Sequence, residues 1–309
     1  MRSISLCSAI TLLALLLYCA PKQQSIQKIP SNEIYYRLAT EITEAPEDVR
    51  FSDPSSVSLD DQGNLYIVDR GNNRLVKLDN SYSFLKDNSE YGLGLSGLSH
   101  PQEIISDAGL GFFVFDQGNN RIVRCDQDLT LSDAIRFTFD PQWQLLGKIA
   151  SIGYSRFGSF FMSDPDNLKV MILDREFLPE GELMPTGGFS RCGAIFIDEE
   201  SNCFVYDSEL RSIFRFDSLG NSAGKIWLPD AGLISDFIVS EEKIFAVDKE
   251  KNQIAVYDLE GSRLIEGDEI MFQISQLKSP SGIALSSDGR LFVCDSGNNR
   301  ILVFVATSR

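Results

Sequence analysis

The body of the chain is a succession of short apolar stretches separated by polar turns. Three segments, residues 65–76, 112–123 and 291–302, are nearly identical: an apolar stretch ends in Asp, and Gly, Asn, Asn and Arg follow one residue later. Leu, Ile, Val and Phe dominate these segments, and no apolar period of 3.6 residues interrupts them. Stretches of this kind are typical of β-strands that are buried on both faces.

Three weaker copies of the pattern lie between the second and the third strong copy. We call the Asp that ends the first apolar stretch of each copy the marker aspartate, and the segment after it the marker loop. The marker aspartates are Asp69, Asp116, Asp164, Asp207, Asp248 and Asp295, at spacings of 47, 48, 43, 41 and 47 residues. Each interval holds about four strands of five to six residues with their turns.

Six copies of four strands predict an all-β fold, namely a six-bladed β-propeller of antiparallel strands over residues 33–309. The last copy has room for only three strands before the chain ends, whereas an additional apolar stretch, residues 33–40, precedes the first copy. We predict that this N-terminal strand completes the last blade, because closing the ring removes a free strand edge.

The first 18 residues combine a positively charged start with an apolar run that is too short for a typical membrane span. They are typical of a secretory signal peptide. Cys19 follows directly and begins a polar tether, residues 19–32, an order that resembles a bacterial lipoprotein signal in which Cys19 carries the lipid. A soluble secreted form and an uncleaved anchor are the alternatives, since the bulky Tyr18 stands where that signal has a small residue. In each case the propeller is exported, and we predict a cell-envelope protein that is anchored to the membrane through its N-terminus.

The segment Pro280–Phe304 contains, in order, Gly-Ile-Ala, Asp-Gly, Leu-Phe-Val and Gly-Asn-Asn-Arg, and it resembles the NHL repeat. The resemblance implies a six-bladed propeller, which agrees with the strand arithmetic. It implies little about the ligand, because members bind proteins, peptides or RNA and relatives in the wider six-bladed group are enzymes. Lactonase-like relatives hold calcium with Glu, Asn and Asp in the central channel. A calcium-dependent lactonase or hydrolase is therefore an alternative function, although we predict no cofactor.

The charge balance narrows the choice of partner. The chain has 28 Lys and Arg against 44 Asp and Glu, a formal charge of −16, and a single histidine, His100. A strongly acidic protein is a poor ligand for nucleic acid. One histidine also excludes the multi-histidine metal sites that six-bladed lyases are expected to use.

A motif that is needed in every blade indicates a structural role. The marker carboxylate can accept loop N–H groups and can pair with the Arg five residues later. We assign this structural role to Asp69, Arg74, Asp116, Arg121, Asp164, Asp207, Asp248, Asp295 and Arg300.

Strand direction places all marker loops and all blade-to-blade crossings on one side of the ring, which we call the loop face; the short hairpins lie on the opposite hairpin face. We expect a ligand on the loop face near the central channel. Trp143 and Trp227 are candidate anchors there, with packing between blades as the alternative. The candidate ligand-face residues are Arg70, Asn72, Asn73, His100, Gln117, Asn119, Asn120, Trp143, Trp227, Ser296, Asn298 and Asn299.

The sequence thus predicts an exported, membrane-anchored β-propeller that acts as a binding or scaffold module for a protein or an envelope component. No catalytic, cofactor-binding or metal-binding residue can be assigned from spacing.

Overall fold

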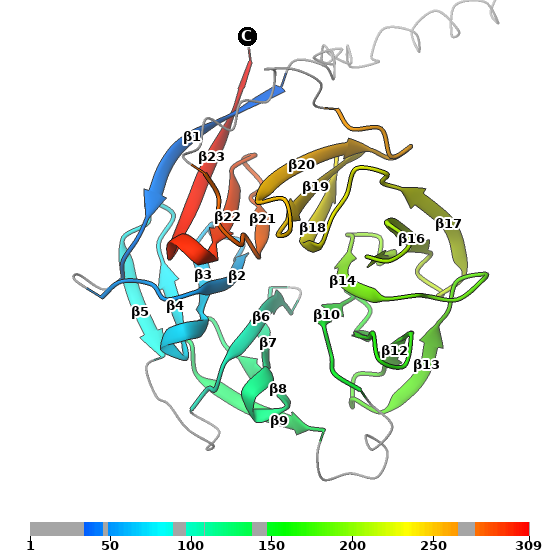
Figure 1. Cartoon of the computed structure of the whole chain (residues 1–309). Helices are drawn as coiled ribbons and strands as arrows, with labels where there is room; N and C mark the ends of the chain where they lie inside the picture. Colours follow the sequence, from blue (N-terminus) through cyan, green and yellow to red (C-terminus); the bar gives the residue numbers. More distant parts are fainter. Residues whose placement is uncertain are drawn as a thin grey trace, which may run out of the picture. The chain divides into compact units, whose positions relative to one another are not determined.

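The computed structural model describes residues 34–45, 49–88, 97–107, 109–137, 147–264 and 276–308. Within these ranges the strands form six separate sheets arranged in a ring, as Figure 1 shows. The prediction of a six-bladed β-propeller is therefore confirmed. The predicted signal peptide and tether, residues 1–32, lie outside the described residues.

Each blade begins with an innermost strand near the centre of the ring and continues outward to its rim. Blade 1 has β2 (Pro54–Leu59), β3 (Leu65–Asp69), β4 (Arg74–Leu78) and β5 (Phe84–Asn88); blade 2 has β6 (Pro101–Ser106), β7 (Phe112–Asp116), β8 (Arg121–Cys125) and β9 (Leu131–Arg136); blade 3 has β10 (Ser151–Tyr154), β11 (Phe160–Asp164), β12 (Lys169–Leu173) and β13 (Pro179–Leu183). Blade 4 has β14 (Cys192–Ile197), β15 (Cys203–Asp207), β16 (Ser212–Phe216) and β17 (Ser222–Trp227); blade 5 has β18 (Ile234–Ser240), β19 (Lys243–Asp248) and β20 (Gln253–Asp258); blade 6 has β21 (Ile283–Leu285), β22 (Leu291–Asp295), β23 (Arg300–Ser308) and β1 (Ile34–Ile42).

The N-terminal strand closes the ring as predicted. β1 is hydrogen-bonded to β23 and forms the outer edge of blade 6, so the first and the last strand of the propeller share one sheet. In blade 5 the described part of the sheet has three strands, and Leu264 turns back onto β20 through a hydrogen bond from its N–H to the carbonyl of Val256 (2.9 Å).

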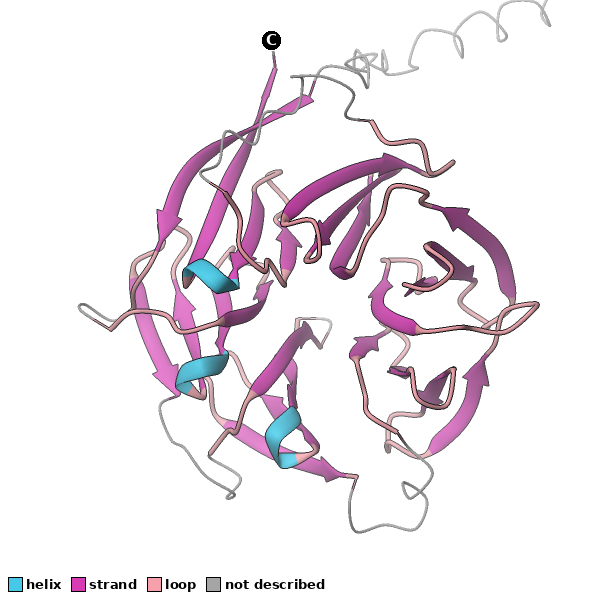
Figure 2. Cartoon of the chain, viewed as in Figure 1, coloured by secondary structure: helices cyan, strands magenta, loops and turns pink. Residues whose placement is uncertain are grey.

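The register is the same in every blade. The marker aspartate, which ends the second strand, lies opposite the first residue of the third strand: Asp69 opposite Arg74, and Asp116 opposite Arg121. In the three strong copies the marker loop forms one short helical turn, which Figure 2 shows in cyan. The sequence pattern predicted loops there and did not predict these turns.

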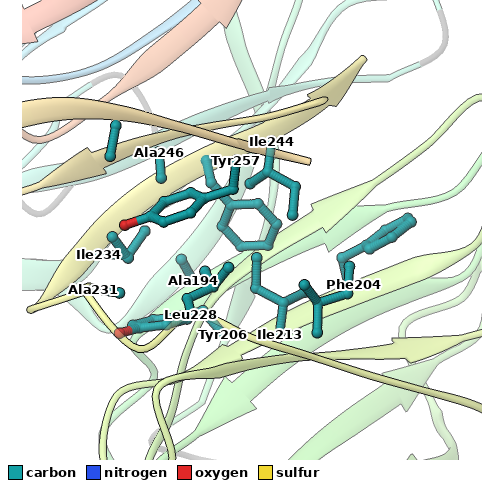
Figure 3. Packing of buried hydrophobic residues seen from close by; sticks show 13 residues of the cluster. Ala194, Phe204, Tyr206, Ile213, Leu228, Ala231, Ile234, Ile244, Ala246 and Tyr257 are labelled. Atoms are coloured by element: carbon teal, nitrogen blue, oxygen red, sulfur yellow. The ribbon is translucent and has the colours of Figure 1, made fainter. Parts of the chain in front are cut away.

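The hydrophobic core lies in the seams between neighbouring blades. Figure 3 shows the seam between blades 4 and 5, where Tyr206 and Ile213 of one blade pack against Ile244 and Tyr257 of the next. Equivalent clusters fill other seams. Each fully buried side chain of this size contributes about 1.5–3 kcal/mol to folding, so the stability of the ring depends on contacts between its blades.

Candidate functional site

The marker loops of the strong copies are held by one repeated network. Asp69 accepts the backbone N–H of Ser52 at one carboxylate oxygen (2.8 Å) and, at the other, the side-chain amide of Asn72 (2.8 Å) and Nε of Arg74 (2.7 Å). Asp116 and Asp295 make the same three bonds in their blades. Every marker aspartate is fully buried, so these carboxylates act inside the scaffold.

The weaker copies satisfy their marker aspartates without Arg. Asp207 accepts four backbone N–H groups, those of Ser190 and Arg191 at one oxygen and those of Glu209 and Leu210 at the other. A buried carboxylate that receives several N–H bonds needs no ionic partner in the same loop. The carboxylate of Asp207 is therefore satisfied without the Arg of the strong copies.

The second Asn of two strong loops connects neighbouring blades. Asn73 and Asn299 have left-handed backbone angles (φ 55° at both), which Asn tolerates better than most residues. Their side-chain oxygens accept the N–H of His100 (2.7 Å) and of Asp53 (2.8 Å) in the next blade. Asn120 also has this conformation, and its carbonyl accepts the N–H of Phe137. The Asn residues predicted on the ligand face therefore take part in the scaffold.

The remaining predicted ligand-face residues are dispersed. Arg70 bonds Asp53 (2.6 Å) and the side-chain carbonyl of Gln102 (2.7 Å), and so links blades 1 and 2. Ser296 is buried and donates to the carbonyl of Pro54. Gln117 begins the equivalent helical turn of blade 2 and is partly buried, and Asn119 and Asn298 donate to their marker aspartates.

His100 and Trp227 belong to different blades. His100 is exposed in a crossing, with a left-handed backbone (φ 46°). Trp227 is the last residue of β17, the outermost strand of blade 4, and its side chain is exposed. Trp143 lies outside the described residues.

Blades 3 and 4 expose large apolar side chains on the loop face. Leu168 and Leu210 lie in the marker loops, at the places of the second and the first Asn of the strong copies, and are 41% and 37% exposed. Met184 directly follows β13 and Trp227 ends β17, and they are 58% and 61% exposed. Blades 3 and 4 thus present large apolar side chains in loops where the strong copies have Asn, and at a strand end where blade 2 has Arg136.

A second group of residues lies on the innermost strands. One position of each innermost strand lies opposite the residue just before the marker aspartate. This position is small in blades 1, 3, 4 and 6 (Ser56, Ser151, Ala194 and Gly282) and acidic in blades 2 and 5 (Glu103 and Asp236). Glu103 and Asp236 belong to β6 and β18, which lie on opposite sides of the ring (Figure 1).

Each of these two carboxylates bonds to the next blade. Glu103 accepts the hydroxyl of Ser151 (3.0 Å) and the N–H of Ile152 (2.9 Å), and Asp236 accepts the N–H of Ile283 (2.9 Å). Burial raises the pKa of Glu103 to about 8, with a further rise from the charge of Asp236. Burial likewise raises the pKa of Asp236 to about 7, against the effect of the bonds from Ile283 and Phe237.

Within the described ranges no three His, Cys, Asp or Glu side chains come together to hold a metal ion. The oxygens of Glu103 and Asp236 accept protein N–H or O–H groups. Calcium takes six to eight oxygen ligands, of which these two carboxylates could supply only a part.

Sequence reasoning identified Trp227 as a candidate but missed Leu168, Met184, Leu210 and the two inner carboxylates. The inner carboxylates had a signal, because Pro101–Ser106 and Ile234–Ser240 each contain one acidic residue. The apolar loop residues had one as well, since Leu168 and Leu210 stand where the strong copies have Asn.

Solved structures share this fold at low sequence identity. A streptogramin B lyase matches with a TM-score of 0.62 and 13% identity, over 89% of this chain and 98% of that one. A gluconolactonase from Xanthomonas campestris matches with a TM-score of 0.62 and 15% identity, over 88% and 97%. A virginiamycin B lyase from Staphylococcus aureus matches with a TM-score of 0.56 and 12% identity, over 88% and 99%. Identities this low support the fold alone.

Sequence comparison is more specific about the repeats. Among curated proteins none matches the chain. The family model of the NHL repeat matches residues 51–78 and 277–304, which span β2 to β4 of blade 1 and, in blade 6, β21, β22 and part of β23. The chain is a six-bladed β-propeller in which segments of blades 1 and 6 match the NHL repeat.

Proposed function

We propose that this propeller is a binding module of the cell envelope, which binds a protein or an envelope component through the loop face of blades 3 and 4. One observation carries the proposal: Leu168, Met184, Leu210 and Trp227 expose apolar side chains in the marker loops and at the ends of the outermost strands of two neighbouring blades. Exposed apolar groups that recur in this way are typical of interaction surfaces, and Trp is enriched among residues that dominate binding energy.

The bonds within the strong repeats also favour blades 3 and 4 as the binding surface. Their Asp, Asn and Arg side chains bond to one another and to the crossings, as at Asp69, Asn72 and Arg74. A ligand that bound these groups would have to break bonds that hold the blades in place. The loops of blades 3 and 4 offer side chains that can be covered without that loss.

Export and anchoring are the second part of the proposal. They rest on the order of the charged start, the apolar run and Cys19. No helix in the described part of the chain is long and apolar enough to cross a membrane. Metabolic labelling with a palmitate analogue tests the anchor: the full chain should take up label and sediment with membranes, and Cys19→Ser should do neither. Label on the Cys19→Ser chain would contradict the anchor.

Complex formation tests the binding surface. Detergent extracts of cells that produce the full chain should contain it in a complex larger than the free protein. The double variant Leu210→Ser, Trp227→Ser should shift the chain to the free size, because two apolar contacts are lost. Leu110→Ser, Leu219→Ser is the matched control, since both residues are highly exposed on the hairpin face. Loss of the complex in the control alone would contradict this assignment.

A further inference from the structure

Three buried polar atoms of blade 5 have no hydrogen-bond partner within the described residues. They are the hydroxyl oxygen of Tyr257, Nε2 of Gln253 and Nε of Arg263. A buried polar group without a partner costs free energy. Such a group in a native protein therefore calls for an explanation, and an ion bound beside it is one.

The three side chains meet on the side of blade 5 that faces blade 4. Gln253 and Tyr257 are four residues apart on β20, and because side chains alternate along a strand, both project to the side on which Tyr257 packs against blade 4. Arg263 pairs with Tyr257 across the turn after β20, and its Nη2 donates to Oε1 of Gln253 (3.1 Å). Nε and Nη2 share one guanidinium, and Nε2 and Oε1 share one amide, so both unpartnered nitrogens lie beside this bond. Burial raises the pKa of Tyr257 and the charge of Arg263 opposes the rise, so the hydroxyl also lies near the guanidinium.

The unused bonding positions at this place are donors. Nε of Arg263 and Nε2 of Gln253 can only donate, and the hydroxyl of Tyr257 can donate as well. The amide of Gln253 cannot turn round, because Arg263 needs its oxygen as an acceptor. The missing group is therefore an acceptor that three donors can share.

The charge of Arg263 favours an anion as this acceptor. Arg263 is half-buried, is in no ion pair of the described residues, and donates to a neutral amide. In a strong blade, by contrast, Arg74 bonds the carboxylates of Asp69 and Asp87 and the carbonyl of Ala45. A partly buried cation without a carboxylate partner is stabilised by an anion from the solution.

The charged groups nearby limit the charge of the anion. The carboxylates of Asp248 and Asp230 act on Tyr257. Lys251 lies beside them, since its N–H donates to Asp248 and its Nζ donates to the carbonyl of Asp230. Arg263 and Lys251 balance these two carboxylates, so a monovalent anion adds one negative charge against three donors, whereas a divalent anion would meet stronger repulsion.

We propose that blade 5 binds a small monovalent inorganic anion, namely chloride, between Arg263, Gln253 and Tyr257. The ion is the acceptor that the three donors share, and it ties β20 to the segment that follows it. Gln253 and Arg263 are half-buried, so the ion enters past their side chains. The site is independent of the partner that the loop face binds.

Thermal unfolding of the full chain at constant ionic strength tests the site. Sodium chloride replaces sodium gluconate, whose anion is too large for a closed site, up to about 100 mM. The wild-type Tm should rise by about 3 °C, the shift that a Kd of about 10 mM gives. Arg263→Met should abolish the rise, and Tyr257→Phe, which removes only the hydroxyl, should reduce it. Arg215→Met is the matched control, because Arg215 is half-buried against Phe204, and it should keep the full rise.

A wild-type Tm that does not respond to chloride, or an Arg263→Met chain that keeps the full rise, would overturn the proposal. Bromide gives a second readout that needs no variant, because it replaces chloride and scatters anomalously. Crystals of the wild-type chain grown in sodium bromide should show an anomalous peak within hydrogen-bond distance of Nε of Arg263, Nε2 of Gln253 and the hydroxyl of Tyr257. The peak should weaken when chloride is added. A water molecule without anomalous signal at this place would also overturn the proposal.

Discussion

Arg300 joins the last strand of the propeller to the first. Its Nε donates to the buried marker aspartate Asp295 (2.7 Å), and its Nη1 donates to Glu41 of β1 (2.9 Å). The same side chain therefore serves the repeated network of blade 6 and the strand that closes the ring. Tyr36, also on β1, packs edge-on against Phe245 of blade 5, with ring centroids 5.5 Å apart.

Removing the closing strand should destabilise the whole ring. A chain that lacks residues 34–42 loses the outer strand of blade 6 and exposes the edge of β23, so we expect its Tm to fall by more than about 10 °C in one cooperative transition. Differential scanning calorimetry measures this. Glu41→Gln is the control; it removes one partly exposed ion pair and should cost less than about 1 kcal/mol. A truncated chain that melts at the wild-type temperature would show that closure is unimportant.

The buried pair of blade 2 should be far more sensitive to substitution than an exposed one. Arg121 and Asp116 are fully buried, 2.6 Å apart. Arg121→Met leaves the carboxylate of Asp116 buried without its cation, which costs about 3–5 kcal/mol. Urea unfolding gives the value.

The exposed pair of blade 3 supplies the comparison for Arg121. Glu182 is exposed and pairs with Lys169 at the register position of Arg121, and Glu182→Gln should cost less than about 1 kcal/mol. If Arg121→Met proved as mild as Glu182→Gln, the marker network would not hold the blade.

The repeat made the number of blades and the closure of the ring predictable from the sequence. Each marker aspartate recurs at a nearly constant interval, and the strand pattern around it needs no long-range information, so blade number and closure followed from the chain alone. The partner of an exposed-looking Asn could not be predicted in this way. Asn72 bonds the carbonyl of Arg50, which lies 22 residues earlier and becomes a neighbour only when the crossing folds over the loop.

Substitutions at two turn glycines distinguish the effect of backbone angle on stability from the effect of packing between blades. Gly261 and Gly289 have similar left-handed angles (φ 88° and 83°), but a Cβ at Gly261 would overlap the carbonyl of Trp227 in blade 4, whereas one at Gly289 would meet nothing. Gly289→Ala should cost about 1 kcal/mol through its backbone angle alone. Gly261→Ala should cost at least about 1 kcal/mol more, because the seam between blades 4 and 5 must shift. Equal losses in urea unfolding would mean that this seam is loosely packed.

Calcium should leave the stability of the protein unchanged. A specific site at one hundred times its Kd would add about 2.7 kcal/mol of stability, whereas the described carboxylates form no metal-binding group. We expect a Tm shift below about 1 °C when calcium replaces a chelator, with magnesium as the control for ionic strength. A shift of several degrees with calcium alone would favour the hydrolase alternative.

Contact between the partner and the apolar residues on the loop face of blades 3 and 4 is the core of the proposed function. Site-specific photo-crosslinking in cells probes this contact, with a photoreactive residue placed at Leu210 or Trp227 and, as the matched control, at Leu110 or Leu219 of the hairpin face. We expect a discrete crosslinked product of the same size from Leu210 and Trp227, and none from Leu110 or Leu219. A product from the hairpin-face positions alone, or from all four positions alike, would refute the proposed contact.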